Sequence, residues 1–92
     1  MTTDYLPIDC DQHSALELLA MRRVQVVAEA RLAGRGVRRL RAQVRDLLTR
    51  DGAEYLILCD QAGESLSIRL DHLLGLSTPE GDRLWRQKTV GE

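Results

Sequence analysis

Residues 24–44 read VQVVAEARLAGRGVRRLRAQV, and in this stretch apolar and polar side chains alternate with a period of two. Such alternation predicts strands that bury one face each. Gly34-Arg35-Gly36 divides the stretch, and glycine supplies the positive φ that a hairpin turn requires. The stretch therefore predicts an antiparallel hairpin, with a second strand from Val37 to Val44. The inward side chains are predicted to be Val24, Val26, Ala28, Ala30, Leu32, Leu40, Ala42 and Val44.

Downstream of the hairpin, further segments have strand character. Residues 54–59 are apolar on both faces, as expected for a central strand. Residues 65–70 alternate again, and residues 73–76 suggest a last short strand interrupted by Gly75. Turns are predicted at Asp51-Gly52 and Ala62-Gly63.

Upstream of the hairpin, the spacing predicts a short helix that begins at Asp11 or Ser14. Ser14 and Glu17 fit a capping box, in which each side chain satisfies a backbone N–H of the first turn. The helix is predicted to bury the apolar stripe of Leu16, Leu19 and Ala20. The residues left for solvent or a partner are Asp9, Asp11, Gln12, His13 and Glu17.

One helix followed by about five or more short antiparallel strands predicts a mainly β fold, a small bent barrel of the Sm-like kind. An OB-like barrel is the alternative, although its helix usually lies between strands. We assign residues 1–81 to this domain. Residues 82–92 form a polar C-terminal tail that could be disordered. Whether the tail folds back around Trp85 stays open.

The bulk composition excludes several classes of protein. A chain of 92 residues makes one domain, and no apolar run approaches the ~20 residues that span a bilayer. The N-terminus carries acids where a signal peptide would carry Lys or Arg, so a cytoplasmic location is expected. Cys10 and Cys59 are too few and too far apart for a zinc site or a disulfide framework, so we expect free thiols, with Cys59 in the core.

The residues that could perform catalysis are few, and we expect no enzyme, no metal and no cofactor. His13 and His72 are predicted at the surface or at a strand junction. Neither cysteine has the context of a nucleophile. Gly34-Arg35-Gly36 is a hairpin turn and not a phosphate loop.

The formal net charge of −1 hides an acidic, basic, acidic order along the chain. Residues 21–50 hold nine arginines against Glu29 and Asp46. Arg39, Arg41 and Arg45 share one strand face and could track phosphates. Surfaces that bind single strands interleave aromatic residues, however, and this run contains none. A solvated face with some ion pairs is therefore favoured.

Several blocks of the sequence together resemble one protein family. The blocks are Tyr5-Leu6-Pro7-Ile8-Asp9-Cys10-Asp11, Leu16-Glu17-Leu18, Asp46-Leu47-Leu48-Thr49-Arg50, Glu54-Tyr55-Leu56-Ile57 and Ile68-Arg69-Leu70-Asp71. In this order they resemble the Rof (YaeO) family of bacterial antiterminators, over roughly residues 5–81. The resemblance implies an Sm-like fold without enzymatic activity or cofactor. It also implies binding to the primary RNA-binding domain of the termination factor Rho, which excludes the transcript.

The resemblance also suggests where Rho would be contacted. A surface that holds RNA phosphates is basic, and carboxylates at the start of a helix can replace those phosphates. We therefore expect the Rho contact at Asp9, Asp11, Gln12, His13 and Glu17, with Ser14 as the helix cap. One departure is the arginine block, because family members are more acidic overall.

The alternative function is an Sm- or Hfq-like ring that binds RNA through its arginine-rich strand face. Sm-type RNA pockets carry an Asn near an Asp in one turn and an Arg-Gly pair in another. Here the corresponding turns read Thr49-Arg50-Asp51-Gly52 and Asp71-His72, so neither signature is intact. The sequence thus favours a free monomer that binds Rho, with no membrane partner and with direct RNA binding as the alternative.

Overall fold

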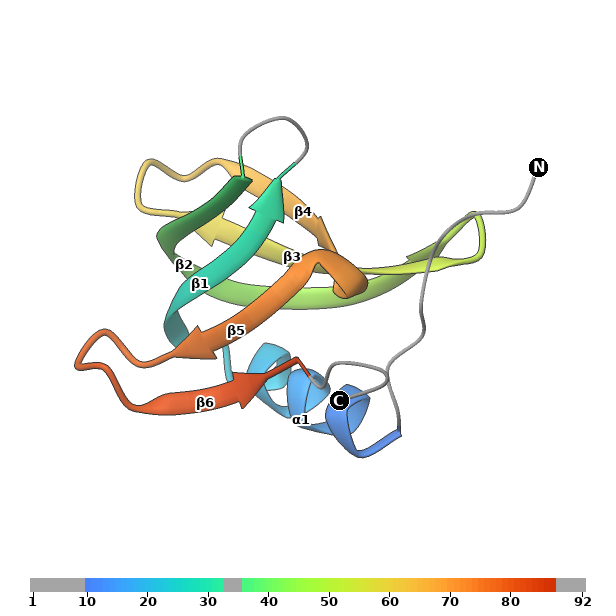
Figure 1. The fold of residues 1–92 in the computed structure, drawn as a ribbon, viewed down its shortest axis with the longest axis horizontal. Helices are drawn as coiled ribbons and strands as arrows, with labels where there is room; N and C mark the ends of the chain where they lie inside the picture. Colours follow the sequence, from blue (N-terminus) through green and yellow to red (C-terminus); the bar gives the residue numbers. More distant parts are fainter. Residues whose placement is uncertain (1–9, 33–35, 88–92) are drawn as a thin grey trace.

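The computed structural model describes residues 10–32 and 36–87, and these form a helix, a 3-10 turn and six strands. The elements are α1 (Cys10–Met21), β1 (Gln25–Leu32), β2 (Gly36–Arg50), β3 (Ala53–Asp60), β4 (Ser65–Arg69), η1 (Leu70–His72), β5 (Leu73–Ser77) and β6 (Arg83–Arg86). The strands make one antiparallel sheet in the order β4-β3-β2-β1-β5-β6 (Figure 1). The mainly β fold with a helix before the strands is confirmed, while its Sm-like assignment stays a prediction.

The hairpin predicted from residues 24–44 is present, but its second strand is longer than expected. β1 pairs with β2 from Gln25 opposite Gln43 to Leu32 opposite Gly36. β2 continues to Arg50, because its second half pairs with β3. A bulge between Val44 and Asp46 interrupts that pairing. Bulges bend a strand and increase its twist, so β2 can belong to both halves of a curled sheet.

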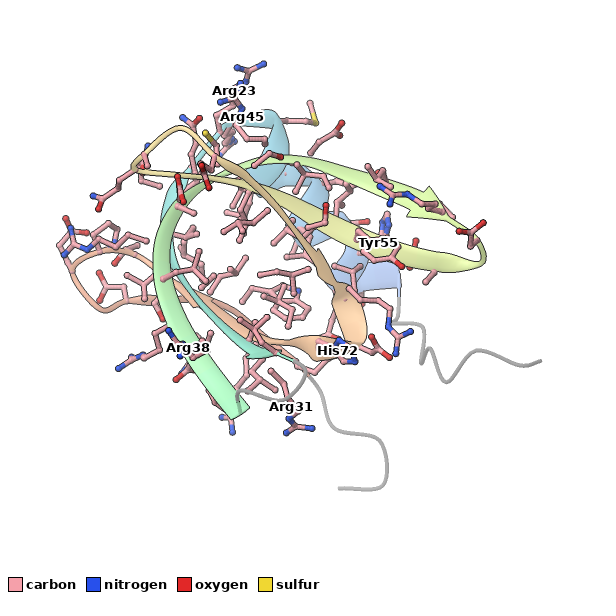
Figure 2. All side chains as sticks on the ribbon, turned by 90° about the horizontal axis from the view of Figure 1, so that it is seen from above. Arg23, Arg31, Arg38, Arg45, Tyr55 and His72 are labelled. Atoms are coloured by element: carbon pink, nitrogen blue, oxygen red, sulfur yellow. The ribbon has the colours of Figure 1, made fainter. Side chains whose placement is uncertain are left out.

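The core fills the space that the sheet encloses, as the side chains in Figure 2 show. α1 covers one end of it with Leu16 and Ala20, which are buried as the apolar stripe predicted. Leu56 and Leu58 of β3 are fully buried. The other buried members of the cluster are Val26, Ala28, Ala30, Ala42, Val44, Ile68, Leu70, Leu73, Leu76 and Trp85.

Cys59 was predicted in the core, and this is wrong. It is half-buried, because it lies on the outer face of β3, where its register partners are Gln43 and Ser65. Leu56 and Leu58 occupy the inner face of the same strand. Both faces of β3 are apolar in sequence, but only the inner one is fully covered.

The capping box predicted at Ser14 is also wrong, because α1 already begins at Cys10. Ser14 lies inside the helix and is exposed. Contacts to residues distant in sequence hold the first turn: the Gln12 side chain donates to the Arg86 carbonyl at 2.6 Å. Among the described residues no helix is long and apolar enough to cross a bilayer.

The tail expected from residue 82 onward is folded back in its first part. β6 pairs with β5, and Trp85 is only 5% exposed. Its indole Nε1–H donates to the Gln12 carbonyl at 3.1 Å. The Gln87 side chain donates to the Leu70 carbonyl at 2.7 Å and to the Leu73 carbonyl at 3.2 Å. The sheet therefore extends past residue 81, whereas residues 88–92 lie outside the described part of the chain.

Candidate functional site on the outer face of α1

The side of α1 that faces away from the core exposes a mixed acidic and apolar surface. Positions three or four apart share one side of a helix, which gathers these side chains in a stripe. Leu18 is 45% exposed and Met21 is 81% exposed, and their spacing of three residues places these two apolar side chains next to each other. We call this surface the outer helix face; its members are Asp11, Ser14, Glu17, Leu18 and Met21, all of them exposed.

Two of the predicted contact residues lie on the outer helix face, namely Asp11 and Glu17. The Glu17 side chain is 57% exposed, and its one ion-pair contact with another described residue is a long one, 3.8 Å from Oε1 to His13 Nδ1. Asp11 forms no ion pair with any residue in the described ranges. Both carboxylates are thus accessible to a basic partner. Asp9, the third predicted acid, lies outside the described residues.

Gln12 was expected to face a partner, but it is half-buried and points along the protein surface to β6. Its side chain donates to the Arg86 carbonyl, and its own carbonyl accepts the indole N–H of Trp85. These two hydrogen bonds tie the first turn of α1 to the last described strand. Gln12 therefore positions the helix.

His13 joins α1 to the start of β3. Its Nε2 lies 2.9 Å from Glu54 Oε2, and both side chains are less than a third exposed. Gln12 holds one side of the helix to β6, and His13 holds the other side to β3. The outer helix face points away from both contacts. Sequence reasoning placed His13 on the polar surface because its partner is distant along the chain.

Replacing His13 by Ala should lower the free energy of unfolding by about 1 kcal/mol, the usual contribution of one hydrogen bond. The reason is the loss of one donor to Glu54 and of a contact that holds α1. Urea denaturation followed by circular dichroism measures the change. Ser14→Ala is the matched control, since Ser14 is exposed one position further along; an equal midpoint for both variants would contradict the anchoring role.

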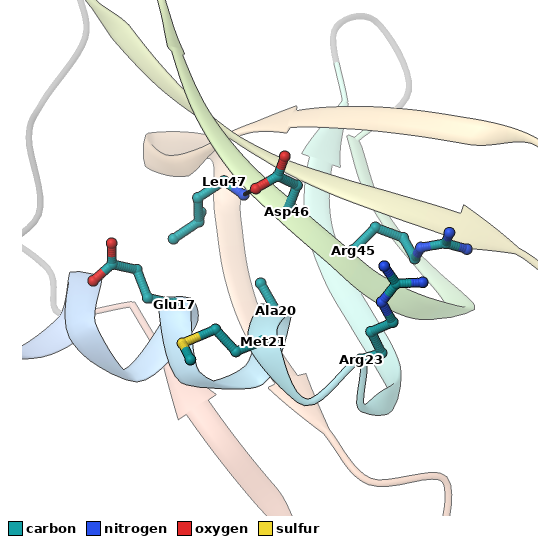
Figure 3. Close-up of a pocket in the computed structure, with 7 residues that line it drawn as sticks. All are labelled: Glu17, Ala20, Met21, Arg23, Arg45, Asp46 and Leu47. Carbon is teal, nitrogen blue, oxygen red and sulfur yellow. Dashed lines mark hydrogen bonds between the residues drawn. The ribbon is translucent and has the colours of Figure 1, made fainter.

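A groove of about 410 Å³ adjoins the outer helix face, where the end of α1 meets the β2 bulge (Figure 3). Glu17 lies at one end of it and Arg23 with Arg45 at the other. Its lining residues are Glu17, Ala20, Met21, Arg23, Arg45, Asp46 and Leu47. The lining combines acidic and basic side chains with the apolar Ala20, Met21 and Leu47. A mixed lining of this kind is better suited to binding a polypeptide surface than a small charged molecule.

The sequence did not predict this groove, because its shape depends on two local features of the backbone. The bulge turns both Arg45 and Asp46 to the surface. Arg23 has a φ of +50°, a left-handed conformation that is uncommon for a residue other than glycine. It ends the helix sharply and directs the chain into β1. Neither feature leaves a regular pattern in the sequence.

The remaining polar cluster belongs to the turn between β4 and β5. Arg69 binds Asp71 through two hydrogen bonds of 2.7 and 3.0 Å, and its Nη2 lies 3.3 Å from His72 Nε2. Such a two-point pair fixes the 3-10 turn. Within residues 10–32 and 36–87, no group of three or more His, Cys, Asp and Glu side chains is placed to hold a metal ion.

Comparisons with known proteins match nearly the whole domain. A family model described as "Modulator of Rho-dependent transcription termination (ROF)" matches residues 7–84. Two curated relatives, both named "Protein rof", come from Escherichia coli (strain K12) and Shigella flexneri. Each is 34% identical to this chain over 80 residues, which cover 87% of the chain and 89% of the relative. The region matched by the family model contains α1 and the strands up to β5, and it ends within β6.

Proposed function

Because the chain belongs to the Rof family of modulators of Rho-dependent transcription termination, we propose that it binds Rho at the primary RNA-binding site and blocks RNA loading. The outer helix face carries this proposal. It offers the carboxylates of Asp11 and Glu17 on a folded element, and a surface that normally binds RNA phosphates attracts such groups. Asp9 is proposed to extend the acidic surface.

The way α1 is held supports a binding role for its outer face. Gln12 and His13 fix the two edges of the helix, and Leu16 and Ala20 fix its inner side. Side chains on a fixed element lose little further freedom on association, which favours binding. The proposed contributions therefore differ: Asp11 and Glu17 touch Rho, whereas Gln12 and His13 position the helix.

Leu18 and Met21 enlarge the proposed contact beyond the acids. Apolar surface removed from water contributes roughly 25 cal/mol per Å², and a methionine adapts its shape to an irregular partner. Exposed apolar side chains next to charges are typical of surfaces that bind another protein. We propose that the two side chains contact Rho together with the neighbouring groove.

We propose a non-enzymatic inhibitor that is monomeric when free and acts in the cytoplasm. Suppressed termination follows from competition, because Rho that cannot load on the transcript cannot terminate. No cofactor is required for this step.

Transcription in vitro on a template that carries one Rho-dependent and one intrinsic terminator tests the function. Adding the protein should raise readthrough at the Rho-dependent terminator in a saturable way and leave the intrinsic terminator unchanged. Unchanged readthrough at the first terminator, or equal readthrough at both, would contradict the proposal.

A further inference from the structure

A second surface, on the outer side of the sheet, gathers arginines from strands that are distant in sequence. Arg39 and Arg41 belong to β2, and Arg83 belongs to β6, with β1 and β5 between them. The register aligns Arg41, Val27, Ser77 and Arg83 in one row across four strands. They border a groove of about 400 Å³, which we call the arginine groove; its lining residues are Val27, Arg39, Leu40, Arg41, Ser77, Thr78, Pro79, Gly81 and Arg83.

The charge of the arginine groove is clearly positive. Glu29 lies between two of the arginines, with Oε2 3.5 Å from Arg39 Nε and Oε1 4.0 Å from Arg83 Nη1. One carboxylate thus orients two guanidinium groups but neutralises only one charge. Arg41 is exposed and has no ion pair with any other described residue. Glu80 and Asp82 of the nearby turn do not line the groove.

Gly75 allows the Arg83 side chain to lie across β5 toward Glu29. A Cβ at Gly75 would collide with Arg83 Nη1 and would come within 3.3 Å of the Trp85 carbonyl oxygen. The position of this guanidinium therefore depends on the missing side chain. Arg83 and Glu29 belong to strands that do not pair directly, and the glycine lets them meet.

The turn between β5 and β6 adds hydroxyl donors beside the arginines. Thr78 Oγ1 accepts the backbone N–H of Asp82 at 3.0 Å, and the Thr78 N–H donates to the Asp82 carbonyl at 2.7 Å. The Thr78 hydroxyl proton remains available to a ligand, as does that of Ser77, whose hydroxyl makes no hydrogen bond within the described residues. Guanidinium forks and hydroxyls are the donors that proteins use for phosphate oxygens.

We propose that the arginine groove binds the phosphodiester backbone of single-stranded RNA. Val27 and Pro79 lie among the arginines and can pack against a ribose, whereas the Leu40 side chain packs against the core. No aromatic residue lines the groove, so bases would not stack there and binding would be independent of sequence. The proposal stands apart from the contact with Rho, because the arginine groove and the outer helix face share no residue.

Anisotropy of a short fluorescent oligouridine, titrated with the protein in the absence of Rho, tests the proposal. Each phosphate contact to a single strand contributes about −0.7 to the slope of log K against log salt, so three arginines predict a slope of about −2. Arg41→Glu should weaken binding at low salt roughly tenfold, the effect expected when a charged hydrogen bond is lost. The slope should become shallower by about 0.7.

Arg38→Glu is the matched control, with the same change of charge on the same strand. Arg38 pairs with the buried Ala30, so its side chain points to the opposite side from Arg39 and Arg41. This variant should bind within about twofold of the wild type, since isolated surface charges contribute little. Three results would overturn the proposal: equal weakening by both variants, oligoglutamate competing as well as unlabelled oligouridine, or no binding at low salt.

Discussion

Replacing Asp11 and Glu17 together by lysine is expected to weaken binding to Rho by about a hundredfold. Two attractive charges become repulsive at a basic surface, and like charges that face each other in an interface cost several kcal/mol. Both side chains are exposed, so the stability of the domain should change by no more than about 0.5 kcal/mol for each substitution. Titration of fluorescently labelled Rho with the variant measures the affinity.

Glu80→Lys combined with Asp82→Lys is the matched control, since both acids are exposed in the turn between β5 and β6. This pair changes the net charge of the protein by the same amount on a different surface. Its affinity for Rho should stay within about threefold of the wild type, because exposed charges away from a contact contribute little. Equal losses for the two double variants would mean that overall charge, and not the outer helix face, governs binding.

Replacing Trp85 by alanine should lower the free energy of unfolding by about 3–5 kcal/mol, the range for removing a large aromatic residue from a core. Trp85 is buried between the sheet and the first turn of α1, and it donates to the Gln12 carbonyl. Small domains have a total stability of about 5–15 kcal/mol, so this variant would be close to unfolding. Thermal and urea denaturation measure the loss.

Trp85→Phe separates the two contributions of this residue. It keeps most of the buried ring but removes the N–H donor, which should cost about 1 kcal/mol beyond the small change in packing. A loss of less than about 1 kcal/mol for Trp85→Ala would show that β6 does not close the core as described.

The strands that bury one complete face could be predicted from the sequence. Val26, Ala28 and Val44 are buried as their alternation required, because a shift of one residue would turn the whole apolar set to solvent. β1 pairs with β2 as the predicted hairpin requires, and a turn lies at Asp51-Gly52 as predicted, although β2 runs to Arg50, past its predicted end at Val44. In these segments the alternation of apolar and polar residues agrees with the observed burial, so the alternation alone was enough to predict which side chains face the core.

Features that depend on contacts between distant residues could not be predicted. The first turn of α1 is stabilised by hydrogen bonds to Trp85 and Arg86, 73 and 74 residues away from Gln12. Without those contacts Ser14 fits a cap equally well, and the helix start was placed too late. β6 is a strand of four residues with a single buried side chain, too short to show a period.

Only part of the candidate site could be predicted from the sequence. Asp11 and Glu17 stand out in an acidic segment, and they lie on the outer helix face. Leu18 and Met21 share that face by helical spacing and were missed, although they fall off the stripe of Leu16, Leu19 and Ala20. Apolar residues on both sides of a short helix hide which of them a partner would contact.

The most direct test of the proposed function is to titrate the protein into Rho that carries a fluorescent pyrimidine-rich RNA and to follow anisotropy at two salt concentrations. We predict that the protein displaces the RNA, that displacement weakens as salt rises, and that the Asp11→Lys, Glu17→Lys variant needs about a hundredfold higher concentration for the same displacement. RNA that stays on Rho at saturating concentrations of the wild-type protein would contradict binding at the primary site.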